Sequence, residues 1–154
     1  MPKIKRIPFA PEYQAASVAA SEAGDSNACF PIAIALLTDI DIATVRAAFE
    51  TAGRKSGQGT PWGIAREATK ALGYDLKRLP IRWRLDMIES YPGIAKTLQN
   101  ITTRHTVRYP QAWAGVNVLL HVNGHVAAVK DGRILDWSAN RALRVIEAYE
   151  VVRL

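Results

Sequence analysis

The chain has 154 residues, of which 49% are hydrophobic; this fits one globular domain and excludes a disordered chain. Its single cysteine excludes an internal disulfide and a cysteine-rich zinc site, and suits a reducing compartment. The formal net charge is +6, but the basic residues are scattered, which favours a solvated basic surface over a nucleic-acid-binding arm. We therefore expect one domain over residues 1–154 and disfavour nucleic acid as a partner.

The apolar segments are too short to span a membrane. The longest near-continuous apolar run covers residues 28–37, well under the roughly 20 residues that a membrane-spanning helix needs. Near the N-terminus, Pro8, Pro11 and Glu12 occupy positions where a signal peptide would need an apolar core. We expect no membrane association, no export and a cytoplasmic location.

Four helices are expected in the first half of the chain. Residues 24–27 are Gly, Asp, Ser and Asn, which interrupt one helix and can cap the next. The next helix, from Cys29 to Leu37, is apolar on nearly all sides, so we expect it to be buried at the centre of the domain. Thr60 and Pro61 favour the start of a later helix, and Gly73 favours its end. The expected helices span residues 12–22, 29–37, 41–51 and 61–72.

The C-terminal part of the chain predicts an antiparallel sheet. Asn123-Gly124 and Asp131-Gly132 each separate two strand-like runs, and this pattern is typical of tight two-residue hairpin turns. Helices followed by an antiparallel sheet indicate the α+β class. The expected strands span residues 116–122, 125–130, 133–137 and 143–152. Residues 3–9 are expected to be extended, and residues 82–90 and 94–99 to form short helices.

Cys29 lies where the capping residues give way to the apolar helix. A thiol is a weak nucleophile at neutral pH unless its pKa is lowered, and a helix N-terminus or a nearby imidazolium lowers it. The N–H groups of the first helical turn should point toward Cys29. Two interpretations stay open: a reactive nucleophile, or a buried cysteine that only fills space in the core.

The second hairpin brings a histidine and a carboxylate to one face of the sheet. With Asp131-Gly132 as the turn, Ala127 faces Asp136, and His125 faces position 138. Because side chains alternate between faces, His125 and Asp136 are diagonal neighbours within reach of each other. The carboxylate can then accept from one ring nitrogen and leave the other for a thiol. The same alternation places Trp137 on the opposite face, in the core.

The same register sets the other two histidines aside. His121 faces Val126 across the first turn, so it points to the face opposite His125 and is expected to be structural or exposed. His105 has no carboxylate partner in the nearby sequence. A surface His125–Asp136 pair without a catalytic role remains the alternative to a triad.

The order of these residues resembles the papain-like cysteine peptidase superfamily, especially its small bacterial and phage-type members. In both, a cysteine opens a buried helix, a histidine opens a strand, and an Asp or Asn follows at the next strand. Residues 124–137 carry most of the likeness and residues 27–31 the rest. Transglutaminase-like and arylamine-acetyltransferase-like proteins share the Cys, His, Asp order. The resemblance implies a single papain-like domain over residues 1–154, with Cys29, His125 and Asp136 as catalytic residues.

One position departs from the pattern of that superfamily. Its peptidases usually carry a glutamine about six residues before the cysteine, which helps to stabilise the oxyanion, whereas Ala23 stands here. Gln14 lies too far back to replace it. One of residues 25–27 could take over, and Asn27 is preferred because its amide can donate a hydrogen bond whereas an ionised aspartate cannot. The backbone N–H of Cys29 would be the second donor.

These features predict a thiol hydrolase that cleaves a peptide, isopeptide or side-chain amide bond in a protein or peptide substrate. Neither a metal nor an organic cofactor is required for this chemistry. Deamidation and acyl transfer use the same residues and stay open. The missing glutamine favours an alternative: a weak or inactive papain-like scaffold, phage- or mobile-element-encoded, that blocks a host protein in the host cytoplasm. Residues 56–60, which lack the Gly-Lys-Ser/Thr ending of a phosphate-binding loop, are expected to form a flexible wall of the active-site cleft.

Overall fold

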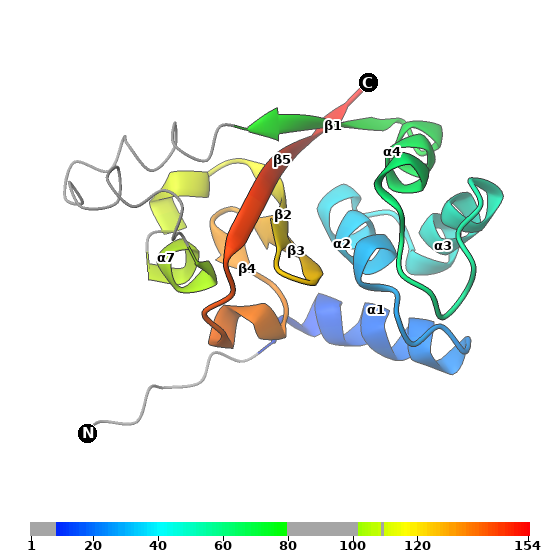
Figure 1. The fold of residues 1–154 in the computed structure, drawn as a ribbon, viewed down its shortest axis with the longest axis horizontal. Coiled ribbons are helices and arrows are strands. Elements are labelled where there is room, and N and C mark those ends of the chain that lie inside the picture. The colour runs from blue at the N-terminus through cyan, green and yellow to red at the C-terminus, as the bar shows by residue number, and fades with distance from the viewer. Residues whose placement is uncertain (1–8, 80–101, 109) are drawn as a thin grey trace.

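Helices come first along the chain and an antiparallel sheet follows, so the predicted α+β class is confirmed (Figure 1). The computed structural model describes residues 9–79, 102–108 and 110–154. Nearly all of the predicted extended segment 3–9, and both predicted short helices at 82–90 and 94–99, lie outside these residues. The described helices are α1 (Pro11–Glu22), α2 (Cys29–Thr38), α3 (Ile42–Thr51), α4 (Trp62–Ala71), α7 (Thr103–Arg108) and the short 3-10 helices η2 (Pro110–Trp113) and η3 (Trp137–Asn140). The strands are β1 (Tyr74–Leu79), β2 (Asn117–Val122), β3 (His125–Lys130), β4 (Arg133–Ile134) and β5 (Val145–Arg153).

The described strands form a sheet in the order β1-β5-β2-β3-β4, and every pairing is antiparallel. Asp131 and Gly132 have φ angles of 51° and 81°, as a tight two-residue turn requires. Lys130 pairs with Arg133, and Val122 pairs with His125. Both predicted hairpin registers are therefore confirmed next to their turns. The sequence did not indicate β1, which pairs with β5 at the edge of the sheet.

The strand predicted over residues 133–137 ends early. The β3–β4 ladder stops at Ile134, although the Leu135 N–H still donates to the Ala128 carbonyl at 3.1 Å. Asp136 then caps η3, because its Oδ1 accepts from the Ser138 N–H at 2.9 Å. An aspartate that hydrogen-bonds the backbone two residues ahead favours a turn over a strand. The predicted pairing of Ala127 with Asp136 is therefore wrong, and the chain turns at Asp136.

Helix α2 is buried at the centre of the fold, as predicted. Every α2 residue after Cys29 is buried, and the helix is apolar on all sides. It contacts β2 and β3 on one side and α1, α3 and α4 on the others (Figure 1). A helix without a polar face must be covered all round. The opposite face of the sheet carries a second apolar cluster that includes Trp113.

The central position of α2 should be visible in the stability of the protein. Ile34 lies in the middle of α2 with 0% of its surface exposed. We expect Ile34→Ala to lower the free energy of unfolding by about 2–5 kcal/mol, because it removes buried methyl groups and leaves a cavity. Val18 on α1 is 55% exposed, and Val18→Ala should change that free energy by less than about 0.5 kcal/mol. Urea unfolding of the two variants measures both values, and equal losses would contradict the central position of α2.

Candidate active site

The structure brings the side chains of Cys29, His125 and Asp136 together. Cys29 is the first residue of α2, His125 is the first residue of β3, and Asp136 precedes η3. His125 Nε2 lies 2.6 Å from Asp136 Oδ2, and the two side chains are only 8% and 6% exposed. The Cys29 thiol lines the same cavities as His125, and each of the two groups shifts the pKa of the other. With Nε2 held by the carboxylate, Nδ1 is the ring nitrogen left for the sulfur.

Asp136 reaches His125 because its two oxygens have different partners. Oδ1 accepts hydrogen bonds from the backbone N–H and the hydroxyl of Ser138, which fixes the carboxylate at the start of η3. Oδ2 stays free for the imidazole of His125. The turn that ends the strand ladder therefore also orients the carboxylate. A carboxylate fixed in this way sets the tautomer and the direction of the ring.

The electrostatics of the site favour an ion pair between the thiol and the imidazole. Burial raises the pKa of Cys29, but the hydrogen bond and charge of His125 and the N–H groups of Val126 and Phe30 outweigh it, so that pKa is lowered. Burial lowers the pKa of His125, but Asp136 and the Cys29 sulfur outweigh it and raise that pKa to about 9. The two shifts together favour a thiolate and an imidazolium at neutral pH.

The N-terminus of α2 is not capped as the sequence suggested. Its N-cap residue is Ala28, whose side chain makes no capping hydrogen bond to the first turn. The predicted capping role of residues 24–27 is therefore wrong for α2. Uncapped first-turn N–H groups have no partner inside the helix and carry partial positive charge. One of them, on Phe30, interacts with the Cys29 sulfur.

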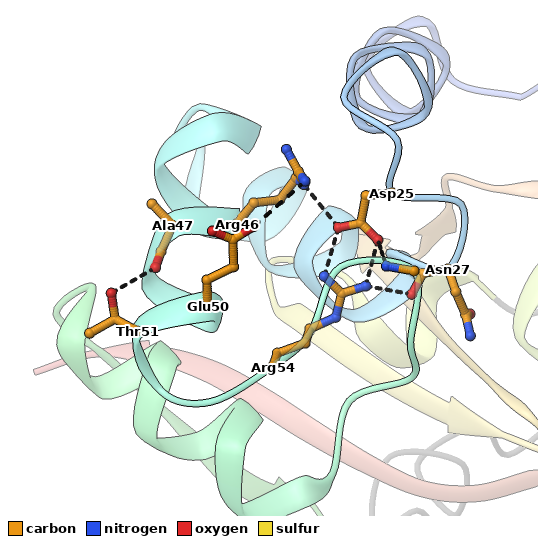
Figure 2. Close-up of polar contacts among 8 residues, drawn as sticks. Asp25, Asn27, Arg46, Ala47, Glu50, Thr51 and Arg54 are labelled. Atoms are coloured by element: carbon orange, nitrogen blue, oxygen red, sulfur yellow. Dashed lines mark hydrogen bonds and ion pairs between the residues drawn. The ribbon is translucent and has the colours of Figure 1, made fainter.

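Asp25 instead forms a buried ion pair with Arg54 (Figure 2). Arg54 donates to both of its oxygens, at 2.7 and 2.8 Å, and neither side chain is exposed. Arg46 donates to Oδ2 at 2.9 Å, and the Gly57 N–H donates to Oδ1 at 2.9 Å. Arg54 also donates to the carbonyl of Asn27 at 2.8 Å. This network fixes the segment before Cys29 against the loop at residues 53–59, and sequence reasoning missed it.

Asn27, the predicted oxyanion residue, lies beside the thiol. It is exposed, and it lines two cavities that also contain Cys29 and His125. Its carbonyl is held by Arg54, while its side chain points away from the Asp25–Arg54 pair (Figure 2). The position is therefore compatible with a donor to a molecule bound at Cys29.

The prediction that Trp137 lies in the core on the opposite face of the sheet is wrong. Its ring lies 4.4 Å from the imidazole of His125 at an angle of 34°, and it is only partly buried. The reason is the early end of β4, because a residue in η3 no longer follows the strand alternation. The indole therefore packs against the imidazole of His125 instead of the core on the opposite face.

Cys29 and His125 line two cavities. The first has a volume of about 370 Å³, and α1 contributes Tyr13, Ser17 and Ser21 to its wall. The second has a volume of about 320 Å³ and is more apolar, with Phe30 and Trp62 in its wall. Gly59 and Thr60 also line the second cavity, so the predicted role of residues 56–60 as a wall of the cleft is confirmed.

His121 lies closer to the site than expected. It pairs with Val126, as the register predicts. It nevertheless lines the second cavity together with Cys29 and His125, so the prediction that it faces away from the site is wrong. Its Nδ1 is 3.9 Å from Glu147 Oε1. His105 belongs to α7, and its side chain is outside the description.

Comparison of the chain with protein-family models, with characterised proteins and with solved structures finds no match. The functional argument therefore rests on the residues and their geometry. Within the described ranges, no helix combines the length and apolar character that crossing a membrane requires. The same residues contain no group of three or more His, Cys, Asp or Glu side chains arranged to hold a metal ion.

Asp25 should contribute stability at neutral pH that is lost in acid. The Arg54 guanidinium holds the pKa of this carboxyl below its ordinary value. The contribution is therefore present above the unfolded-state pKa of about 4 and is lost as the pH falls below it. We expect Asp25→Asn to lower the free energy of unfolding at pH 7 by about 3–5 kcal/mol, because the buried Arg54 guanidinium loses the carboxylate that balances its charge. Chemical unfolding from pH 7 downward should show a flatter pH dependence for the variant.

Asp39→Asn is the matched control for this experiment. Asp39 also pairs with a cation, at 2.9 Å from Lys130 Nζ, but its side chain is 81% exposed. Its φ of 58° is one that asparagine adopts readily. We expect a loss below about 1 kcal/mol. Similar losses for the two variants would contradict the anchoring role of Asp25.

Proposed function

We propose that the protein is a papain-like thiol hydrolase that cleaves a peptide, isopeptide or side-chain amide bond in a protein or peptide substrate. The observation that carries the proposal is that Cys29, at the start of α2, lines the same cavities as His125, whose Nε2 lies 2.6 Å from Asp136 Oδ2. The α+β order of elements, with the cysteine on a buried central helix, supports the papain-like resemblance.

Each of these three residues has a catalytic role that its surroundings support. The Cys29 thiolate attacks the carbonyl carbon, so a sulfur–carbon bond forms and the carbonyl electrons move to the oxygen. The His125 imidazolium then gives its proton to the leaving amine, and the carbon–nitrogen bond breaks. His125, now neutral, accepts a proton from the water that hydrolyses the thioester. Asp136 keeps the ring in place throughout and stabilises its charged form.

Asn27 is proposed as an oxyanion donor, together with the backbone N–H of Cys29. Its amide lines both cavities beside the sulfur. The structure offers no replacement from Gln14, which is exposed and donates to the Phe9 carbonyl at 3.2 Å. Ala23, at the position of the usual glutamine, is also exposed. The side-chain donor to the oxyanion must therefore come from a residue of the cavity wall, and not from Gln14 or Ala23.

The proposal predicts an unusually reactive thiol. Cys29 should be alkylated by iodoacetamide well below pH 8.5, near which an ordinary cysteine titrates, because its pKa is lowered. His125→Ala should move the alkylation profile back toward that ordinary range, because the imidazolium is lost. Asp136→Asn should have a smaller effect, since the imidazole stays in place. The measurement is the alkylation rate of the folded protein against pH.

Lys130→Ala is the matched control, since it removes a cation from the other end of β3. Lys130 pairs with Asp39 and lines neither of the two cavities beside Cys29. The profile of this variant should stay close to that of the unmodified protein. Turnover of p-nitrophenyl acetate beyond one equivalent, abolished by Cys29→Ala, would show that the acylated cysteine is also hydrolysed. A thiol that reacts only above pH 8 and ignores His125→Ala would overturn the proposal and favour a scaffold that binds a host protein.

A further inference from the structure

A row of hydroxyl groups on α1 faces the thiol across the first cavity. Tyr13, Ser17 and Ser21 are spaced by four residues, so they lie on one face of the helix. All three line the cavity that also contains Cys29 and Asp136. The triad described above uses none of these hydroxyl groups.

Two contacts at the start of α1 hold Tyr13 at this wall. The Ala10 N–H, at the start of α1, donates to the carbonyl of Leu135 at 3.0 Å and so ties the helix to the residue before Asp136. The ring of Phe9 packs edge-on against the Tyr13 ring, with 6.0 Å between their centroids. These contacts fix the position of the phenol relative to the catalytic carboxylate.

The Tyr13 hydroxyl is protonated and able to donate. Burial, together with the negative charges of Asp136 and Cys29, raises the pKa of Tyr13, so the phenol keeps its proton at neutral pH. The Ser17 side chain, one helical turn further along α1 and in the wall of the same cavity, acts against this rise. A protonated phenol in this wall can donate its O–H to a molecule in the cavity.

Thiolate attack on a carbonyl creates a negative oxygen that needs donors fixed in advance and shielded from water. Asn27 is exposed, whereas Tyr13 is partly buried and held by Phe9 and Ser17. We infer that the Tyr13 hydroxyl is a further catalytic group, which donates a hydrogen bond to the oxyanion formed when Cys29 attacks an acyl substrate. This inference rests on the proposed function, and it gives the site the side-chain donor that the absent glutamine would otherwise supply.

Two probes separate oxyanion stabilisation from thiol reactivity. In the reaction with p-nitrophenyl acetate, the sulfur–carbon bond forms, the carbonyl electrons move to oxygen, and p-nitrophenoxide then leaves without needing a proton. In the reaction with iodoacetamide, the sulfur displaces iodide from a saturated carbon and no oxyanion forms. We expect Tyr13→Phe to slow acylation by p-nitrophenyl acetate on the order of 100-fold, while its alkylation rate and pH profile stay within about twofold. Ser17→Ala should slow acylation less, because it only positions the phenol.

Tyr74→Phe is the matched control, since it removes a phenol hydroxyl from β1, away from the residues that line the two cavities beside Cys29. It should leave both rates unchanged. Normal alkylation with an unchanged acylation rate in Tyr13→Phe would overturn the role of Tyr13, and so would an equal loss of both rates. Failure of the proposed function looks different: Cys29 of the unmodified protein would then resist iodoacetamide below pH 8.5.

Discussion

The apolar surface of α2 is the constraint on which the rest of the structure depends. Its residues after Cys29 are buried on every side, so three helices and two strands must surround it. Packing α2 against β3 brings its N-terminus to the end of the strand where His125 begins. The N-cap residue makes no side-chain capping hydrogen bond there, and the Phe30 N–H stabilises a negative sulfur instead. The reactive position of Cys29 is thus a consequence of how the core is assembled.

Two buried carboxylates beside the thiol have different roles. Asp25 accepts from two arginines and from the Gly57 N–H, so all of its hydrogen-bonding capacity is used in holding the chain before α2. Asp136 uses one oxygen for Ser138 and keeps the other for His125. A carboxylate bound only by arginines and backbone N–H groups anchors the chain. A carboxylate paired with an imidazole can instead stabilise the charged form of that ring when the ring takes up a proton.

The sequence predicted the parts of the site that depend on local patterns. The two-residue turns set the hairpin registers, because side chains alternate along a strand, and Cys29 was placed by the change from polar to apolar residues. It could not predict the Asp25–Arg54 pair, whose members are 29 positions apart and come from two loops. Trp137 was misplaced because the turn at Asp136 cancels the alternation. β1 was missed because it is a charged edge strand whose partner, β5, lies at the far end of the chain.

The burial of the His125–Asp136 pair favours the proposed thiol chemistry over an inert scaffold. Removing an ion pair from water is costly, and apolar residues of similar volume would serve a purely structural role as well or better. Here the pair is buried and packed against Trp137, yet one side of the imidazole stays open to a thiol that lines two cavities. A scaffold that only binds a partner has no use for a polarised thiol that lines two cavities. The proposed acyl chemistry uses this combination: a nucleophile whose pKa is lowered, an imidazole beside it that can donate a proton, and cavity space for a substrate at the sulfur.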